Sequence, residues 1–101
     1  MRAVATVLVT WFDTQQGGVI RGELWLSRND EAPARYPTLT MGGSERVALD
    51  VANSLCREAR ELMARYVPGE ADERDTGWSR ARRRDGTVRY GRTVSLTGRI
   101  G

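Results

Sequence analysis

Residues 44–66 read SERVALDVANSLCREARELMARY, and this stretch decides the fold. Its larger apolar residues recur at spacings of three and four, and a second row of smaller residues widens the stripe. The opposite side is charged, Ser44 is a suitable N-cap, and Pro68 and Gly69 end the pattern. We therefore predict a helix over residues 44–66 with one broad buried face. The apolar stripe comprises Val47, Val51, Leu55, Ala59, Leu62 and Tyr66, widened by Ala48, Ala52, Cys56 and Met63.

The rest of the chain has strand-like rather than helical patterns, so we expect a sheet to cover this helix. Residues 3–12 are β-branched or apolar at most positions, which indicates a central strand. Residues 19–28 alternate and form a hairpin with the first strand across a glycine-containing turn. Residues 29–37 contain two prolines and are expected to be a loop, and residues 38–41 are a candidate short edge strand. Residues 69–77 are acidic with little to bury, which predicts a mobile linker.

The last segment, residues 78–100, is predicted to be a basic hairpin. Asp85-Gly86 is a strong signal for a two-residue turn. From Val88 onward, apolar residues alternate with hydroxyl residues or arginine, as in a half-buried strand. A two-residue turn sets Arg82 opposite Arg89 and leaves Arg83 pointing inward or out at an edge. This register predicts four arginines on one outer face: Arg80, Arg82, Arg84 and Arg89.

The predicted architecture is α+β, with residues 1–101 forming a single small domain. One antiparallel sheet of four or five strands, in the order β-β-(β)-α-β-β, packs on the long helix. No apolar run approaches the ~18 residues of a membrane span, and the N-terminal apolar run lacks a signal-peptide cleavage site. We therefore expect a cytoplasmic protein without a membrane partner. Cys56 is the only cysteine, and we expect it to be a small buried hydrophobic residue.

The sequence argues against several kinds of chemistry. The chain has no histidine, which removes the most common general base and metal ligand. It contains no CxxC pair, phosphate loop or dinucleotide-binding fingerprint. Asp72, Glu73 and Asp75 lie in the expected linker, where a catalytic pair would lack fixed geometry. We therefore expect a protein that is not an enzyme and that uses no metal and no cofactor.

The distribution of charge is the main functional signal. All 16 basic residues are arginine. This preference has two explanations: GC-rich codon usage, or a need for planar contacts to phosphate and carboxylate groups. Residues 1–79 hold nine arginines and twelve acidic residues, whereas residues 80–101 hold seven arginines and one acidic residue. Closely spaced arginines on a hairpin repel one another, and an anionic partner relieves that repulsion.

We therefore predict a small binding module whose C-terminal hairpin contacts the backbone of nucleic acid. Hydroxyl groups of Thr87, Thr93, Ser95 and Thr97 are candidates to add contacts to phosphate or sugar. Trp25 departs from the alternation of Leu24 and Leu26, and Trp78 lies at the entry to a strand. Each is therefore either a residue that stacks on a base or a cap at the edge of the core. The predicted binding residues are Arg80, Arg82, Arg83, Arg84, Arg89, Arg92 and Trp78.

Three alternatives stay open. The arginines form a solvated surface, or dock on the acidic residues 70–75 of the same chain, or bind an acidic protein surface. In the last case the protein is a protein–protein interaction module. Examples of that class are a phage or mobile-element inhibitor of the anti-CRISPR kind and an immunity or adaptor protein. The oligomeric state is left open.

Overall fold

The structure, a computed structural model, describes residues 1–99, which form one helix and one seven-stranded antiparallel sheet. The predicted α+β class is confirmed, but the predicted number of four or five strands was too low. Residue 100, the predicted end of the last hairpin, lies outside the described residues. No helix within residues 1–99 is both long and apolar enough to cross a membrane. The elements are β1 (Arg2–Thr14), β2 (Gly17–Arg28), β3 (Ala34–Arg35), β4 (Leu39–Gly42), α1 (Glu45–Tyr66), β5 (Ala71–Asp75), β6 (Ser79–Arg82) and β7 (Val88–Gly98).

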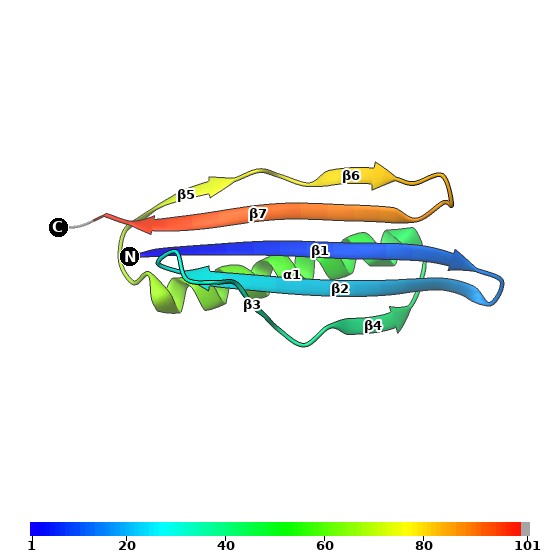
Figure 1. Ribbon diagram of the computed structural model, residues 1–101, viewed down its shortest axis with the longest axis horizontal. Helices are drawn as coiled ribbons and strands as arrows, with labels where there is room; N and C mark the ends of the chain where they lie inside the picture. Colours follow the sequence, from blue (N-terminus) through cyan, green and yellow to red (C-terminus); the bar gives the residue numbers. More distant parts are fainter. Residues whose placement is uncertain (100–101) are drawn as a thin grey trace.

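Three long strands form the middle of the sheet, in the order β2-β1-β7, and short strands complete both edges. β1 is central, as its apolar composition predicted. β3 and β4 pair with β2 at one edge, and β5 and β6 pair with β7 at the other (Figure 1). The turns of the β1–β2 and β6–β7 hairpins lie at the same end of the molecule, which measures 55 × 22 × 22 Å (Figure 1).

Two of the short strands lie where the sequence predicted no regular structure. β3 lies between two prolines, in the predicted loop, and pairs with Trp25 and Leu26. β5 occupies residues 71–75, the middle of the predicted mobile linker, and pairs with β7 from Val94 to Gly98. The linker prediction was wrong because the acidic side chains of β5 meet arginines of α1 and β7, which are distant in the sequence.

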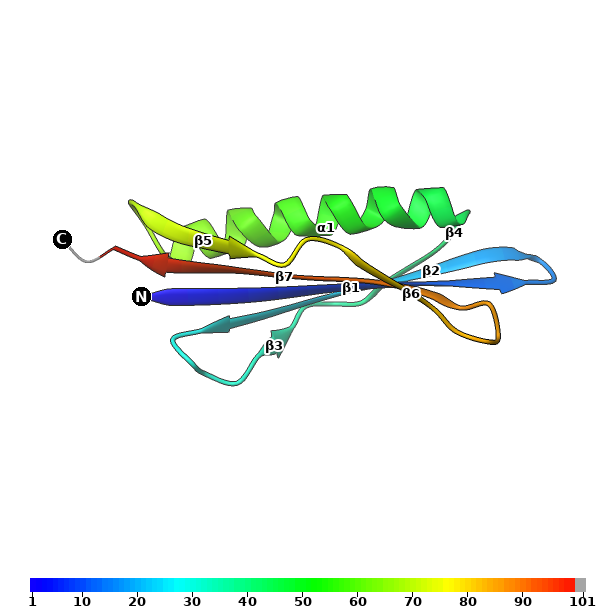
Figure 2. The same cartoon turned by 90° about the horizontal axis from the view of Figure 1, so that it is seen from above.

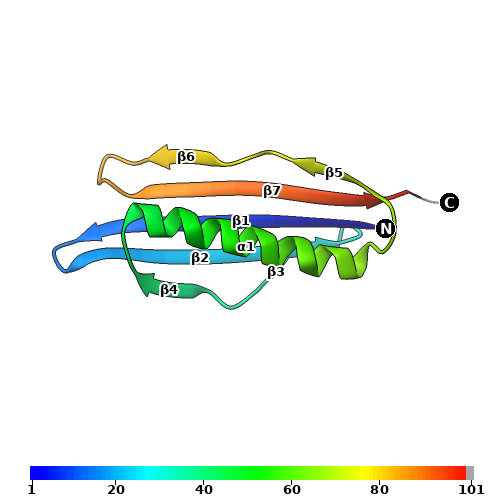
Figure 3. The same ribbon diagram turned by 180° about the vertical axis from the view of Figure 1, so that it is seen from behind.

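α1 lies along one face of the sheet, over β1 and β2 (Figures 2 and 3). Its N-cap is Ser44, as predicted, and the Ser44 side chain accepts a hydrogen bond from the Val47 N–H. The larger residues of the predicted stripe are only partly buried, so the buried stripe is centred one residue further along the helix than predicted. The buried residues of α1 are Ala48, Ala52, Cys56, Ala59 and Met63.

Small side chains explain this shift. Ala3 and Ala5 of β1 belong to the same core as the alanines of α1, and such small residues allow the helix and the strand to approach closely. We call this contact between the alanines of α1 and β1 the seam, and larger side chains of α1 fill the space beside it. The Leu55 Cδ1 atom occupies the space over Gly22, where an added Cβ would lie only 2.8 Å away from it. Trp11 fixes the start of the helix, because its Nε1 donates to the Gly43 carbonyl oxygen at 3.0 Å.

The opposite face of the sheet, which we call the open face, is not covered by α1 (Figure 2). Side chains of the three long strands alternate between the two faces. The open face is formed by Val4, Thr6, Leu8 and Thr10 of β1, by Arg21, Glu23, Trp25 and Ser27 of β2, and by Arg89, Gly91, Thr93, Ser95 and Thr97 of β7.

Replacement of a seam residue tests the close approach of α1. Ala52 is fully buried, so Ala52→Leu should overpack the interface and lower the free energy of unfolding by about 1–3 kcal/mol. Ala64→Leu makes the same change at an exposed site of α1, with the same change in helix propensity. The free energy of unfolding of this variant should stay within about 0.5 kcal/mol of that of the wild type. Urea denaturation measures both, and equal stabilities of the two variants would contradict the close packing.

Candidate functional site

The hairpin between β6 and β7 turns through three residues rather than two. The Arg83 N–H donates to the Thr87 carbonyl oxygen at 2.8 Å, and the Gly86 N–H donates to the Arg83 carbonyl oxygen at 3.0 Å. Gly86 has a φ of +88°, in the left-handed region that a three-residue turn of this kind requires. The Asp85 carboxylate accepts from the Thr87 N–H at 2.9 Å, and this hydrogen bond lowers the pKa of Asp85. Asp85 therefore stabilises the turn.

The additional turn residue shifts the strand pairing by one position. Arg82 lies opposite Val88 and Arg80 lies opposite Tyr90, whereas the two-residue turn expected from the sequence would set Arg82 opposite Arg89. Because consecutive residues of a strand point to opposite faces, this shift moves the β6 side chains to the other face. The predicted row of four arginines on one face was therefore wrong. Arg80 and Arg82 belong to the side of α1, and Arg89 belongs to the open face.

Arg80 contacts the first residue of α1. The Arg80 Nη2 atom lies 2.8 Å from Glu45 Oε1, and the Tyr90 hydroxyl donates to the same oxygen at 2.8 Å. The hydrogen bond from Tyr90, followed by that from Arg80, lowers the pKa of Glu45. A carboxylate in the first helical turn is also favoured by the helix dipole. Arg80 therefore has an intramolecular partner and ties β6 to the start of α1.

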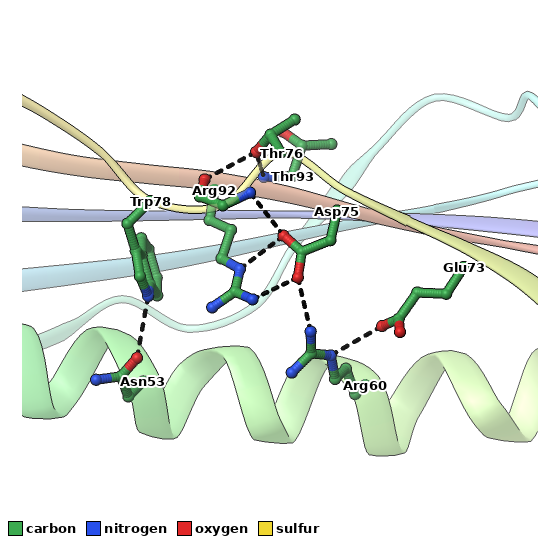
Figure 4. A network of polar contacts seen from close by, with 9 residues as sticks. Asn53, Arg60, Glu73, Asp75, Thr76, Trp78, Arg92 and Thr93 are labelled. Atoms are coloured by element: carbon green, nitrogen blue, oxygen red, sulfur yellow. Dashed lines mark hydrogen bonds and ion pairs between the residues drawn. The ribbon is translucent and has the colours of Figure 1, made fainter.

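Arg92 and Trp78 take part in a polar network that joins β5, β7 and α1 (Figure 4). Arg92 donates through Nε to Asp75 Oδ1 at 2.8 Å and through Nη2 to Asp75 Oδ2. The Arg60 Nη2 atom of α1 donates to the same carboxylate at 2.8 Å. The Arg92 guanidinium lies 5.3 Å from the centroid of the Trp78 ring, and Trp78 Nε1 donates to Asn53 Oδ1 at 3.0 Å.

Two arginines of the C-terminal segment are thus neutralised by the acidic segment before it. Asp75 forms an ion pair with Arg92, and the hydrogen bond from Arg92 is the main reason that the pKa of Asp75 falls from 3.8 to about 2. Asp72 forms an ion pair with Arg99, whose Nη2 atom lies 2.7 Å from Asp72 Oδ1. Docking of the arginines on residues 70–75, one of the alternatives from the sequence, therefore occurs for part of the basic segment.

Four of the predicted binding residues remain without a charge partner. Each is exposed, and none forms an ion pair with any residue in the described part of the chain. The one acidic residue between positions 82 and 89 is Asp85, whose carboxylate supports the turn. We call this group the basic tip, and its members are Arg82, Arg83, Arg84 and Arg89.

Two of the partner residues, Glu45 of Arg80 and Asn53 of Trp78, carried no signal in the sequence. Glu45 and Asn53 lie on α1, 35 and 25 residues from the side chains that they bind. No local pattern connects positions so far apart. Glu73 and Asp75 did carry a signal, because acidic residues two positions apart share one face if the segment is a strand. Both of them contact Arg60.

Acidification tests the Asp75 network. The pKa of Asp75 is depressed to about 2 in the folded protein, so the ionised carboxylate stabilises the fold above about pH 4, and this contribution is lost as the pH falls towards 2. The residue is partly open to water, and screening limits its contribution to about 1 kcal/mol. Asp75→Asn should therefore be less stable than the wild type at pH 7, and the difference should shrink between pH 4 and pH 2.

The measurement is urea denaturation of both proteins across this pH range. Asp50→Asn is the control, because Asp50 is exposed on α1 and has no ion-pair partner among residues 1–99. It should be as stable as the wild type at pH 7. A stability difference for Asp75→Asn that does not change with pH would show that the carboxylate charge is not what holds β5 in place.

Two comparisons with known proteins found no match. The sequence matches no protein-family model, and it has no significant match among curated proteins. The geometry and charge of the basic tip and of the sheet are therefore the observations on which a function can be proposed.

Proposed function

We propose that this protein is a non-enzymatic module that binds nucleic acid, with the basic tip contacting phosphate groups. One observation carries the proposal: none of the four arginines of the basic tip forms an ion pair among the described residues, although Arg80 and Arg92 nearby do. Unpaired like charges on one short hairpin repel one another, and polyanion binding relieves that repulsion.

The position of the basic tip suits contact with a large polyanion. The β6–β7 turn lies at one end of an elongated molecule, beyond the start of α1, so a nucleic acid can approach it from several sides (Figure 1). Arginine contacts phosphate through two parallel N–H groups, which favours it over a point charge for such binding. Contacts of this kind fix position and affinity, and they carry no base sequence.

The proposal divides the predicted binding residues into two groups. The basic tip makes the contacts to phosphate. Arg80, Arg92 and Trp78 support the tip from within the fold, since Arg80 is bound to Glu45 and Arg92 to Asp75. We therefore expect substitutions in the basic tip to lower the affinity for nucleic acid. Substitutions of the supporting residues should instead lower the stability of the fold.

A protein–protein interaction module is the second candidate, and one groove favours it. The groove lies between α1 and β4, has a volume of about 350 Å³, and includes Leu39, Val51 and Leu55. Leu39 is 42% exposed, and Asp50 and Glu58 also line the groove. An apolar segment with flanking basic residues, from a partner protein, has the complementary chemistry.

The salt dependence of binding tests the nucleic-acid proposal. With four phosphate contacts, the logarithm of the binding constant should fall against the logarithm of the salt concentration with a slope of about −3 to −4 on a duplex and about −3 on a single strand. Arg83→Ala combined with Arg84→Ala should flatten the slope by about 1.5–2 and weaken binding to all sequences alike. Fluorescence anisotropy with duplex DNA, single-stranded DNA and RNA gives both quantities.

Arg57→Ala combined with Arg65→Ala is the matched control, because both residues are exposed arginines of α1 away from the tip. This variant loses the same charge and should keep a slope close to that of the wild type. The proposal fails if none of the three nucleic acids binds at low salt, or if the two double variants reduce the slope equally.

Peptide display tests the second candidate. Selection on the wild-type protein should enrich peptides in which basic residues flank apolar ones, and Leu39→Asp should abolish the enrichment. Leu39 is exposed, so this change should be tolerated by the fold. Absence of enrichment, or the same enrichment with Leu39→Asp, would remove the groove as a binding site.

A further inference from the structure

The open face contains a cavity with an aromatic wall. The cavity has a volume of about 300 Å³, at the lower end of the range for small-molecule sites. Trp25 is partly exposed there, and the Arg35 guanidinium lies 5.7 Å from the centroid of its ring. The segment before β3 lies on this side of the sheet and contributes Pro33 to the cavity (Figure 2). The lining residues are Val4, Thr6, Leu8, Trp25, Ser27 and Pro33.

A pair of arginines lies on one side of this cavity. Arg21 of β2 and Arg89 of β7 are both opposite Thr10 of β1, so they flank the central strand in one row across the open face. Neighbouring strands are about 4.8 Å apart, which puts the two Cα atoms roughly 10 Å from each other. Arg89 also belongs to the basic tip, so one residue is common to the tip and the open face.

A second pair of arginines lies on the other side of the cavity. Arg74 is opposite Ser95, and Arg2 is opposite Thr97, in a hollow of about 380 Å³. Asp72 also lines this hollow, but its carboxylate is already bound by Arg99 at 2.7 Å. Arg2 lies 3.6 Å from Asp30, but both side chains are largely exposed and such a surface ion pair is weak. The hollow therefore presents guanidinium and hydroxyl groups, which are the groups that contact phosphate and sugar.

We propose that the open face binds single-stranded nucleic acid, with one unpaired base in the Trp25 cavity and phosphates at the two arginine pairs. The proposal rests on the nucleic-acid binding proposed for the basic tip and names its substrate class. Along β1, the row of Thr10 and the row of Val4 are six residues apart, or about 20 Å. A strand of about four nucleotides, the lower limit for a single-strand binding surface, suits this length.

A duplex does not fit these features. Its bases are paired and stacked inside the helix, so none reaches a cavity on a sheet surface unless it is first unpaired. A single strand exposes the faces of its bases, and stacking on an aromatic side chain accepts any base. The two arginine pairs then bind the backbone on either side of the stacked base.

A second copy of this chain is a poorer occupant of the open face. An antiparallel pair of copies would set the Arg21 and Arg89 row of one against the Arg2 and Arg74 row of the other. Glu23, 3.5 Å from Arg21, offsets one charge of the first row, and Asp30, 3.6 Å from Arg2, offsets one charge of the second. Arg89 and Arg74 form no ion pair among the described residues, so each row keeps a net positive charge. Like charges facing one another oppose such a dimer, and they favour an anionic strand.

Photochemical crosslinking tests the proposal without a substitution. The probes are oligothymidylate and oligouridylate of about eight nucleotides, each with one 5-iodinated pyrimidine, irradiated with the intact protein and digested with trypsin. Trypsin cuts after Arg21 and Arg28 and releases residues 22–28, which contain Trp25. Mass spectrometry should find the adduct on Trp25 in this peptide, and the two probes show whether DNA or RNA is preferred. Adducts confined to other peptides would overturn the proposal.

Affinity measurements provide the second test. Trp25→Leu keeps an apolar side chain but removes the stacking surface, and it should weaken binding of oligothymidylate about 5- to 100-fold with little change in salt slope. Duplex affinity should not change. Tyr66→Leu is the control, because Tyr66 belongs to α1 on the covered side of the sheet, where the Arg28 guanidinium lies 4.6 Å from the centroid of its ring. It should leave single-strand affinity within about 2-fold of the wild type.

The outcomes separate this inference from the proposed function. If single strands bind with a steep salt slope but Trp25→Leu binds as tightly as the wild type, the open-face proposal fails and the role of the basic tip stands. If Trp25→Leu and Tyr66→Leu weaken binding equally, the open-face proposal also fails. If neither single strands nor duplexes bind, both proposals fail. Thermal melts establish whether each variant is folded. If Trp25→Leu does not fold, the crosslinking result alone decides whether the open-face proposal holds.

Discussion

The alternation of side chains along β7 is the constraint on which the rest of this structure depends. β7 pairs with β1 on one side and with both β5 and β6 on the other, so its register fixes three neighbours at once. Val88 and Tyr90 face α1 and complete the core, while Arg89 between them faces the open side. A shift of one residue would bury the arginine and expose the core residues, which makes this register the stable one.

Charge compensation follows from that register. Arg92 faces the helix side and is only 18% exposed, a position that would be costly for a guanidinium without an acidic partner. Asp75 of β5 supplies the partner, and Arg60 of α1 binds the same carboxylate. The excess positive charge of residues 80–101 is therefore partly neutralised by acidic residues from earlier in the chain. The part left uncompensated is concentrated in the basic tip.

The two proposed binding surfaces use different physical forces. The basic tip offers guanidinium groups in water, so its contribution to binding comes from release of counterions and falls with salt. The Trp25 cavity offers an apolar aromatic wall, so its contribution comes from stacking and is nearly independent of salt. Arg89 connects the two surfaces, since it belongs to the tip by position and to the open face by register. A nucleic-acid strand that contacts both surfaces would gain affinity from the charge of the basic tip. The Trp25 cavity would add a preference for unpaired bases.

The sequence by itself determined the elements whose signals are local: the helix with its Ser44 cap, the first hairpin, and the α+β class. It left open what depends on partners far along the chain. Asp85-Gly86 is compatible with turns of two or three residues, and only pairing decides between them. The three-residue turn avoids setting Arg82 opposite Arg89 and brings Arg80 to Glu45, 35 residues away. Residues 71–75 became a strand for the same reason, because acidic side chains that look solvated in the sequence meet arginines that only the tertiary fold brings to them.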